Sequence, residues 1–374
     1  MILGFGPSGH VGHPPTLPAV GTYGSAVPDD LLPLPAQPKG VPWPTTKWPG
    51  GDPPPGLEAA VDEVFSDEDR YGTTYGVAVV QGGRLLLERY GGALPHFDRP
   101  PEPVEPDTAL LSWSMAKSVL HAAVGLLVGE GRLRLDESPS VPGWDDDRSA
   151  ITLDHLLQMR DGLRWLEDYV DDGVSNVIAM LFGEGKDDVA AYAAASPLAH
   201  PPGTVFNYSS GTSNIVAGIL GRAIGPEPVQ AFLRDRVLHP IGMGSADPRV
   251  DDAGTFIGSS FVYATAKDWA RFGLLYLRDG VWEDERLLPE GWVDHGRLVR
   301  SLDETDGSLY GAHWWIDQLD TARGTFRASG YEGQMVAINP ALDAIVVRLG
   351  HTPEPQPTPA HLPVWRKRVF DTLS

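Results

Sequence analysis

Ser114-Met115-Ala116-Lys117 is the stretch that decides the fold, because it sets a hydroxyl group one helical turn from an amine. Residues three apart share one face of a helix. The apolar residues that follow recur with a helical period: Met115, Val119, Ala122 and Leu126. We therefore expect Ser114 to open a buried helix, with Lys117 on the same side. A serine hydroxyl needs a base within hydrogen-bond reach to become a strong nucleophile, and a desolvated, neutral lysine can be that base.

The alternative is an ordinary helix-capping serine followed by an unrelated surface lysine. The neighbours of Lys117 argue against this alternative, because the expected helix is apolar on nearly all sides from Val119 to Val128. A helix of that kind usually lies inside a large domain. Lys117 is therefore expected to be buried, although a short motif still needs the rest of the chain to complete a site.

The composition excludes several classes of partner. The chain has 374 residues and a formal net charge of −21, whereas nucleic acids and anionic membranes are bound by basic surfaces. It contains no cysteine, which excludes disulfides and thiol catalysis and leaves the redox compartment undecided. Residues 1–38 contain neither Lys nor Arg and no apolar run of signal-peptide length, so we expect a cytoplasmic protein.

The order of the predicted elements indicates one folded unit built around an antiparallel sheet. Residues 1–56 are rich in Pro and Gly and form an N-terminal arm, and residues 57–374 form the folded domain. Stretches with strand character lie near both ends of that domain: 75–80, 85–90, 325–328, 334–338 and 344–349. We expect 57–130 and 260–374 to form an α/β part, into which a helical segment, 131–259, is inserted.

Two further segments could complete a catalytic site with Ser114. Tyr208 lies on a loop before an apolar helix, where its phenol could exchange a proton, although anchoring the loop is the commoner role of a lone tyrosine. Glycines interrupt the expected strand in 328–333, and such glycines often mark a close approach of backbones, here of a substrate carbonyl. The backbone N–H groups of Ser114 and Tyr331 would then form an oxyanion hole. A plain hairpin turn is the alternative for this segment.

With these segments in this order, the chain resembles the serine β-lactamase and penicillin-binding superfamily, on its class C-like, esterase and 6-aminohexanoate-dimer hydrolase branch. The resemblance runs from about Thr74 to Leu349. The motifs that carry it are 111–118 (LSWSMAKS), 151–159 (ITLDHLLQM), 161–163 (DGL), 202–203 (PG), 208–210 (YSS) and 263–273 (YATAKDWARFG). The resemblance implies an α/β (α+β) fold, a sandwich of an antiparallel sheet flanked by helices, with an inserted all-helical subdomain and the site between the two parts.

The resemblance also implies roles for individual residues. Ser114 would be the acylated nucleophile, Lys117 its proton acceptor and Tyr208 the third catalytic group. Ser114 and Tyr331 would donate the oxyanion hydrogen bonds. The expected substrate contacts are Ser210, Ser329, Gly330 and Tyr169, the last as a residue that closes over the substrate. The implied reaction is a two-step acyl transfer to water without a metal or an organic cofactor.

The chain departs from the superfamily pattern at two positions. Ser210 stands where the second motif usually has Asn, and Ala328 stands where the third motif has Lys or His. A cation at the latter position commonly binds the substrate carboxylate, so its loss argues against β-lactamase or transpeptidase activity. The acidic segment 145–188 could favour a substrate with a free amino group. A solvated surface is the alternative interpretation of those acids.

Three functions remain open from the sequence. The leading one is a serine hydrolase that cleaves small carboxylic esters or linear amides, 6-aminohexanoate oligomers among them. The second is a D-amino-acid peptidase or a vestigial β-lactamase. The third is a catalytically silent binding protein on the same fold. The expected partner is the small-molecule substrate, and the sequence leaves open whether the chain forms a homodimer.

Overall fold

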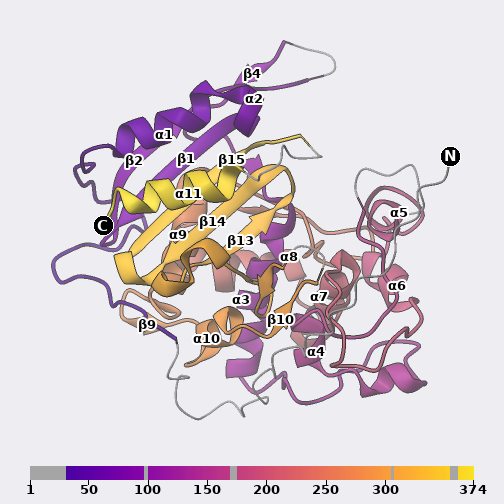
Figure 1. The fold of residues 1–374 in the computed structure, drawn as a ribbon. Helices are drawn as coiled ribbons and strands as arrows, with labels where there is room; N and C mark the ends of the chain where they lie inside the picture. Colours follow the sequence, from indigo (N-terminus) through magenta and orange to yellow (C-terminus); the bar gives the residue numbers. More distant parts are fainter. Residues whose placement is uncertain (1–30, 97–99, 169–174, 305–306, 354–360) are drawn as a thin grey trace, which may run out of the picture.

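The computed structural model describes residues 31–96, 100–168, 175–304, 307–353 and 361–374. Its main feature is an eight-stranded antiparallel sheet with the order β10-β11-β12-β13-β14-β15-β1-β2 (Figure 1). The strands are β1 Thr73–Gln81, β2 Arg84–Tyr90, β10 Ser301–Leu302, β11 Leu309–Tyr310, β12 Trp315–Ile316, β13 Phe326–Gly330, β14 Gln334–Asn339 and β15 Ala344–His351. Strands from the two ends of the domain meet where β1 pairs with β15, which confirms the predicted antiparallel sheet.

Both faces of the sheet are covered by helices. Helices α1 (Leu57–Ser66) and α11 (His361–Asp371) lie on one face, and α9 (Ala266–Leu277) lies on the other (Figure 1). Successive strand residues point to opposite faces, so Val77 and Val79 pack in the cluster with α1 and α11. Ala78 and Val80 belong to the cluster that contains α9.

The helix that carries the serine motif lies in the middle of the molecule. A 3-10 turn, η1 (Trp113–Met115), leads into α3 (Ala116–Gly129), whose residues are buried as far as Leu127. Helix α3 packs against β13 on one side and against α7 (Ser210–Ile224) on the other. This central position confirms the burial predicted from the apolar neighbours of Lys117.

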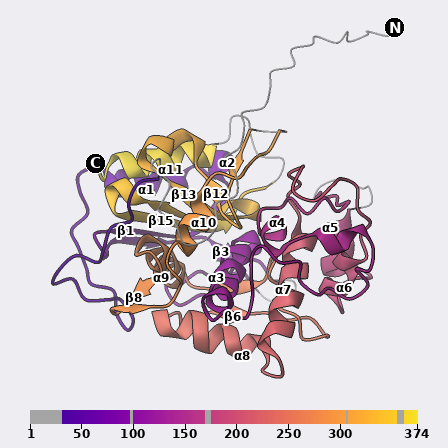
Figure 2. The same cartoon turned by 90° about the horizontal axis from the view of Figure 1, so that it is seen from below.

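Helices are the main regular elements of the span 131–259. Besides α7 it contains α4 (Leu153–Leu157), α5 (Asn176–Phe182), α6 (Val189–Ala194) and α8 (Val229–Leu233). Helices α4, α5 and α6 lie to one side of the sheet in Figure 2. It also contains the short strand β6 (Asp247–Pro248), so the prediction of an all-helical insert is wrong in this detail. Strand β6 pairs with β7 (Val262–Ala264), and β7 pairs with β5 (Leu110–Leu111). A two-residue edge strand ending in proline leaves no alternating pattern in the sequence.

The remaining elements are short. They are α2 (Glu68–Tyr71), α10 (Trp292–Arg297), β3 (Ala93–Leu94), β4 (Glu102–Pro103), β8 (Val281–Trp282) and β9 (Glu285–Arg286). Within the described ranges, no helix combines the length and the apolar character needed to cross a bilayer.

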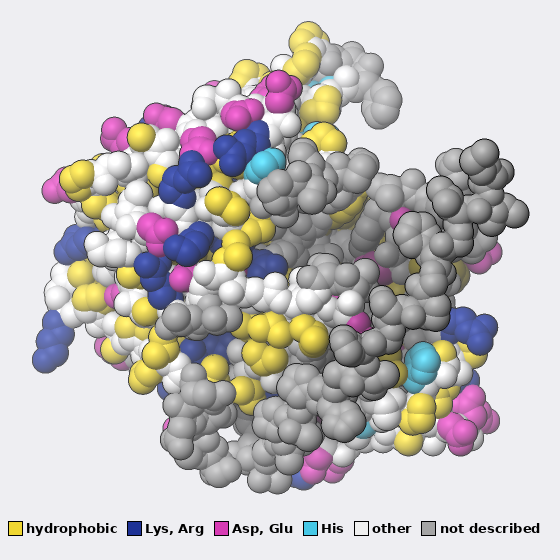
Figure 3. All heavy atoms as spheres, in the orientation of Figure 1, with side chains coloured by type: hydrophobic (Ala, Val, Ile, Leu, Met, Phe, Trp, Pro, Cys, Tyr) yellow, Lys and Arg dark blue, Asp and Glu magenta, His cyan; other side chains and the backbone are white. Residues whose placement is uncertain are grey.

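The described part of the N-terminal arm, residues 31–56, lies against the sheet and α9. Trp48 is buried in the core, and Pro49 and Gly51 exchange backbone hydrogen bonds with Leu85 in β2 at 2.9 and 3.0 Å. Arg271 of α9 donates a hydrogen bond to the carbonyl of Pro44 at 2.8 Å. On the face that carries α1 and α11, acidic and basic side chains alternate (Figure 3), and Lys367 pairs there with Asp371 at 2.8 Å.

Candidate active site

Ser114 lies in a turn whose preceding residue, Trp113, has an unusual backbone conformation. Trp113 has a φ of 46°, in the left-handed region that bulky residues rarely adopt. Its indole donates a hydrogen bond to Glu332 at 3.1 Å and packs edge-on against the ring of Tyr331. These contacts hold the strained residue, and the next residue, Ser114, lines a cavity.

Lys117 is held by three polar contacts although only 2% of it is exposed. Its Nζ lies 3.1 Å from the Oγ of Ser114, 3.1 Å from the Oγ of Ser210 and 3.0 Å from the carbonyl oxygen of Ser259. The structure therefore brings together the two residues that the motif predicts as a pair.

The environment of Lys117 favours its neutral form. Burial lowers the pKa of Lys117 to about 8, and the negative charge of Glu167 opposes this shift. A lysine with such a pKa is partly unprotonated near neutral pH. It can therefore accept a proton from Ser114.

Tyr208 lies beside this pair, with Lys117 Nζ 4.8 Å from the centre of its ring. Burial and the charge of Glu167 raise the pKa of Tyr208, and hydrogen bonds with Ser114 and Trp315 only partly offset this. The phenol therefore stays protonated at neutral pH. Of the two candidate bases, Lys117 is the one with an accessible neutral form, and Tyr208 is suited to donate a hydrogen bond or a proton.

These residues border a cavity of about 270 Å³. It is lined by Ser114, Tyr208, Ser308, Trp315, Arg327, Ser329, Gly330 and Tyr331. The sequence analysis named five of these residues, all at the predicted motifs. It missed Ser308 and Arg327. Arg327 could have been found from strand alternation, because it lies two residues before Ser329 on β13 and donates a hydrogen bond to Ser329 Oγ at 3.0 Å.

Gly330 marks a close approach, as predicted, but the partner is the chain itself. A Cβ at Gly330 would lie 2.2 Å from the carbonyl oxygen of Ser112. The end of β13 therefore packs directly on the turn that presents Ser114. Beyond it, the buried Arg348 donates hydrogen bonds to the carbonyls of Glu332 and Gly333 at 2.9 and 3.1 Å. These bonds hold the turn that begins with Tyr331.

Ser210, for which the sequence predicts a substrate contact, is fully buried and does not line the cavity. Its hydroxyl lies between Lys117 and Glu167, and it donates to Glu167 Oε1 at 2.5 Å. The sequence analysis missed Glu167, because an acid inside an acidic segment resembles any surface acid. Tyr169, the predicted lid residue, lies outside the described residues.

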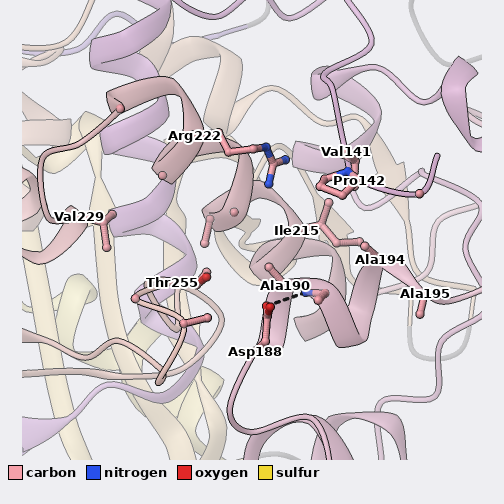
Figure 4. Close-up of a pocket in the computed structure, with 18 of the residues that line it drawn as sticks. Val141, Pro142, Asp188, Ala190, Ala194, Ala195, Ile215, Arg222, Val229 and Thr255 are labelled. Atoms are coloured by element: carbon pink, nitrogen blue, oxygen red, sulfur yellow. Dashed lines mark hydrogen bonds between the residues drawn. The ribbon is translucent and has the colours of Figure 1, made fainter. Parts of the chain in front are cut away.

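A larger cavity, of about 840 Å³, lies between α6 and α7 (Figure 4). Its walls are mostly Ala and Gly, and none of the predicted site residues lines it. Of its polar residues, Asp188 caps α6, and Arg148 is bonded to Asp146 and to backbone carbonyls. These contacts stabilise the helical span, and we place no chemistry in this cavity.

A half-buried serine in contact with a buried lysine at the start of a central helix, next to an antiparallel sheet, defines a serine hydrolase of the β-lactamase fold. The chain belongs to the Beta-lactamase family, whose sequence profile matches residues 61–368. The 6-aminohexanoate-dimer hydrolase of Paenarthrobacter ureafaciens is 27% identical over 323 residues, which cover 80% of this chain and 76% of that protein.

Two solved structures share the fold. A family VIII carboxylesterase superposes with a TM-score of 0.66 at 14% identity, covering 86% of this chain and 99% of the other. A penicillin-binding protein from Bacillus halodurans superposes with a TM-score of 0.63 at 20% identity, covering 83% and 99%. At such identities these likenesses establish the architecture and leave the substrate open.

Proposed function

We propose that this protein hydrolyses small carboxylic esters or linear amides through an acyl-enzyme on Ser114. The observation that carries the proposal is the 3.1 Å contact between Ser114 Oγ and the nearly fully buried Lys117, whose pKa is lowered to about 8. Lys117 takes the hydroxyl proton as Ser114 Oγ attacks the substrate carbonyl. Water then attacks the acyl-enzyme and releases the acid.

The cavity residues supply the other parts of this mechanism. The backbone N–H groups of Ser114 and Tyr331, both at the cavity wall, stabilise the oxyanion of the tetrahedral intermediate. Tyr208, which stays protonated, donates a proton to the leaving alcohol or amine. After the leaving group departs, Lys117 passes the proton that it took from Ser114 to the phenolate of Tyr208, and both residues return to their starting states.

Two residues of β13 bear on the class of substrate. Ala328, at the position of the third-motif cation, is buried and offers no charge to a penicillin carboxylate. Arg327 supplies a charge on the cavity side of β13 instead. A substrate that carries a carboxylate therefore suits this cavity. 6-Aminohexanoate oligomers are linear amides of this kind, and the relative from Paenarthrobacter ureafaciens, a 6-aminohexanoate-dimer hydrolase, supports testing them first.

The first experiment compares hydrolysis of a short-chain p-nitrophenyl ester by wild type and by Ser114→Ala. Intact mass after treatment with a fluorophosphonate probe is the paired measurement. We expect turnover and one adduct with the wild type, and neither with the variant, which stays folded. Full activity in Ser114→Ala would refute the site. A folded wild type with no turnover and no adduct would favour the catalytically silent binding protein.

A second candidate function is a penicillin-reactive peptidase or β-lactamase, which the likeness to a penicillin-binding protein keeps open. A mass increase equal to one penicillin or cephalosporin molecule on Ser114 would support it. The absence of Lys or His at Ala328 leads us to expect no stable adduct. A cytoplasmic location stays a prediction from the sequence, and the sequence leaves open whether the chain forms a homodimer.

A further inference from the structure

Glu167 is joined to the pair of Ser114 and Lys117 through the side chain of Ser210. Its Oε1 accepts a hydrogen bond from Ser210 Oγ at 2.5 Å, and its Oε2 accepts from the backbone N–H of Ser210 at 2.9 Å. The indole of Trp165 donates to the same Oε2 at 2.6 Å. The carboxylate thus sits at the N-terminus of α7, where negative charge is favoured, and three donors fix its orientation.

Counting protons around Lys117 shows what this carboxylate controls. A serine hydroxyl has one proton, and the proton of Ser210 is committed to Glu167. Ser210 Oγ can therefore only accept from Lys117 Nζ, which lies 3.1 Å away. The carbonyl of Ser259, at 3.0 Å, is also only an acceptor. A neutral lysine has two N–H protons and one lone pair, so when these acceptors take both protons the lone pair faces Ser114.

We propose that Glu167 is a positioning residue that acts through Ser210 to direct the lone pair of Lys117 toward the hydroxyl of Ser114. Without the carboxylate, the Ser210 hydroxyl is free to turn and donate to the lysine lone pair, which would block the base. The inference rests on the proposed acyl-enzyme function of Ser114. It also gives a reason for the departure from the second motif, because the serine at 210 passes on the orientation that Glu167 sets.

Glu167→Gln is the sharpest variant, because it keeps the shape of the side chain and changes one acceptor into a donor. Two donors already converge on Oε2, so the amide oxygen is expected to occupy that place. The NH₂ group then faces Ser210 Oγ and donates to it. The hydroxyl of Ser210 must then turn its proton toward Lys117, which reverses the hydrogen bond that we infer to be essential.

The variant also has an electrostatic signature. The charge of Glu167 raises the pKa of Lys117, so its removal moves that pKa further down. Among the described residues, His313 and Tyr208 are the other ionisable groups that interact with Lys117, and Tyr310 packs against Tyr208. Burial and the charge of Lys117 lower the pKa of His313 to about 3, and burial raises those of both tyrosines. Between pH 6 and 10 the acid limb of kcat/KM therefore reports Lys117.

The experiment measures pH profiles of ester hydrolysis and fluorophosphonate labelling rates for wild type, Glu167→Gln and Ser210→Ala. We expect kcat of Glu167→Gln to fall about 10-fold or more with little change in KM, because Glu167 does not line the cavity. Its acid limb should move to lower pH by about 0.5 unit or more, given that a nearby opposite charge shifts a pKa by about 1–3 units. Simple loss of packing would not lower the plateau of the pH–rate profile and also move its acid limb to lower pH.

Two variants complete the design. Ser210→Ala removes the hydroxyl that joins Glu167 to Lys117 and leaves the bond from Trp165 to Glu167, so it should lose rate even if Glu167→Gln folds poorly. Glu184→Gln removes the same charge from an exposed position and should match the wild type in rate and profile. If the wild type labels and turns over while Glu167→Gln keeps its rate and pH profile, the role of Glu167 is wrong and the proposed function stands. If the folded wild type neither labels nor turns over, both fall.

Discussion

Lys117 Nζ lies 3.1 Å from Ser114 Oγ, while only 2% of the lysine is exposed. Burial removes water from the amine and lowers the pKa of Lys117 to about 8. The position that puts Lys117 in contact with Ser114 therefore also favours its neutral form, which can act as a base. A solvated lysine at this spacing would stay charged and would be a poor proton acceptor at neutral pH.

The first prediction is the pH dependence of catalysis. The neutral form of Lys117 is the active one, so kcat/KM should rise about 10-fold per pH unit on the acid side and level off above the pKa of about 8. Initial rates with a p-nitrophenyl ester from pH 5.5 to 9.5 measure this curve. Lys117→Arg keeps its positive charge over this whole pH range, so this variant should show no ester hydrolysis at any of these pH values. A flat profile with full activity over this range would contradict the assignment of Lys117 as the base.

The second prediction concerns the phenol of Tyr208. Its ring packs against Trp315 and Tyr310 with centroid separations of 5.1 and 5.9 Å, and Tyr208→Phe keeps these contacts. Loss of the proton donor should lower kcat by about 100-fold or more. The thermal midpoint should change little. Tyr263→Phe, at a ring that packs on Arg249 outside the cavity, is the matched control and should keep the wild-type rate. Equal rates for both variants would remove Tyr208 from the mechanism.

The sequence was sufficient to predict the elements whose physical signals are local. The helical period after Ser114 predicted α3. The contact between Ser114 and Lys117 was predictable for the same reason, because the two residues are separated by one helical turn. The motif resemblance then placed Tyr208 and Tyr331 at the same cavity.

The parts that sequence reasoning missed depend on contacts between distant segments. Glu167 reaches Ser210 across 43 residues, and only the packing of the loop before α7 distinguishes it from the neighbouring surface acids. Arg327 lies outside the third motif, whose cation position is Ala328, the next residue, with its side chain on the opposite face of β13. In the same way, the close neighbour of Gly330 is a carbonyl of the chain and could not be known before the sheet was folded.

The third prediction tests that close approach with Gly330→Ala. A methyl group there would lie 2.2 Å from the carbonyl oxygen of Ser112, and that backbone must move away together with the turn carrying Ser114. We expect a loss of about 1–3 kcal/mol in stability and a larger relative loss of kcat, measured by urea unfolding and ester hydrolysis. Gly221→Ala in α7, where no atom lies within 4 Å of the added methyl, should instead gain up to about 1 kcal/mol. Wild-type activity in Gly330→Ala would show that the turn can accommodate the methyl group without displacing Ser114, and would contradict this prediction.

The last prediction links the burial of His313 to stability in acid. His313 is 2% exposed, its Nδ1 has no hydrogen-bond partner among the described residues, and burial and the charge of Lys117 lower its pKa to about 3. In the unfolded chain the histidine has a pKa of about 6.5, so between pH 6.5 and 3 the unfolded chain binds a proton at His313 and the folded chain does not. The contribution to stability is therefore complete above pH 6.5 and is lost as the pH falls toward 3, at about 1.4 kcal/mol per pH unit.

His313→Asn removes the group that takes up this proton in the unfolded chain. Asparagine also suits the backbone, because φ at position 313 is 55° and asparagine tolerates the left-handed region. Urea unfolding at pH 7, 6 and 5 should show a free energy of unfolding that falls less steeply in the variant, by about 1.4 kcal/mol per pH unit. His200→Asn, at an exposed histidine, should keep the wild-type slope. Equal slopes for wild type and His313→Asn would mean that the folded protein takes up the proton at His313, and that the neutral state of this histidine is not part of what holds the site together in acid.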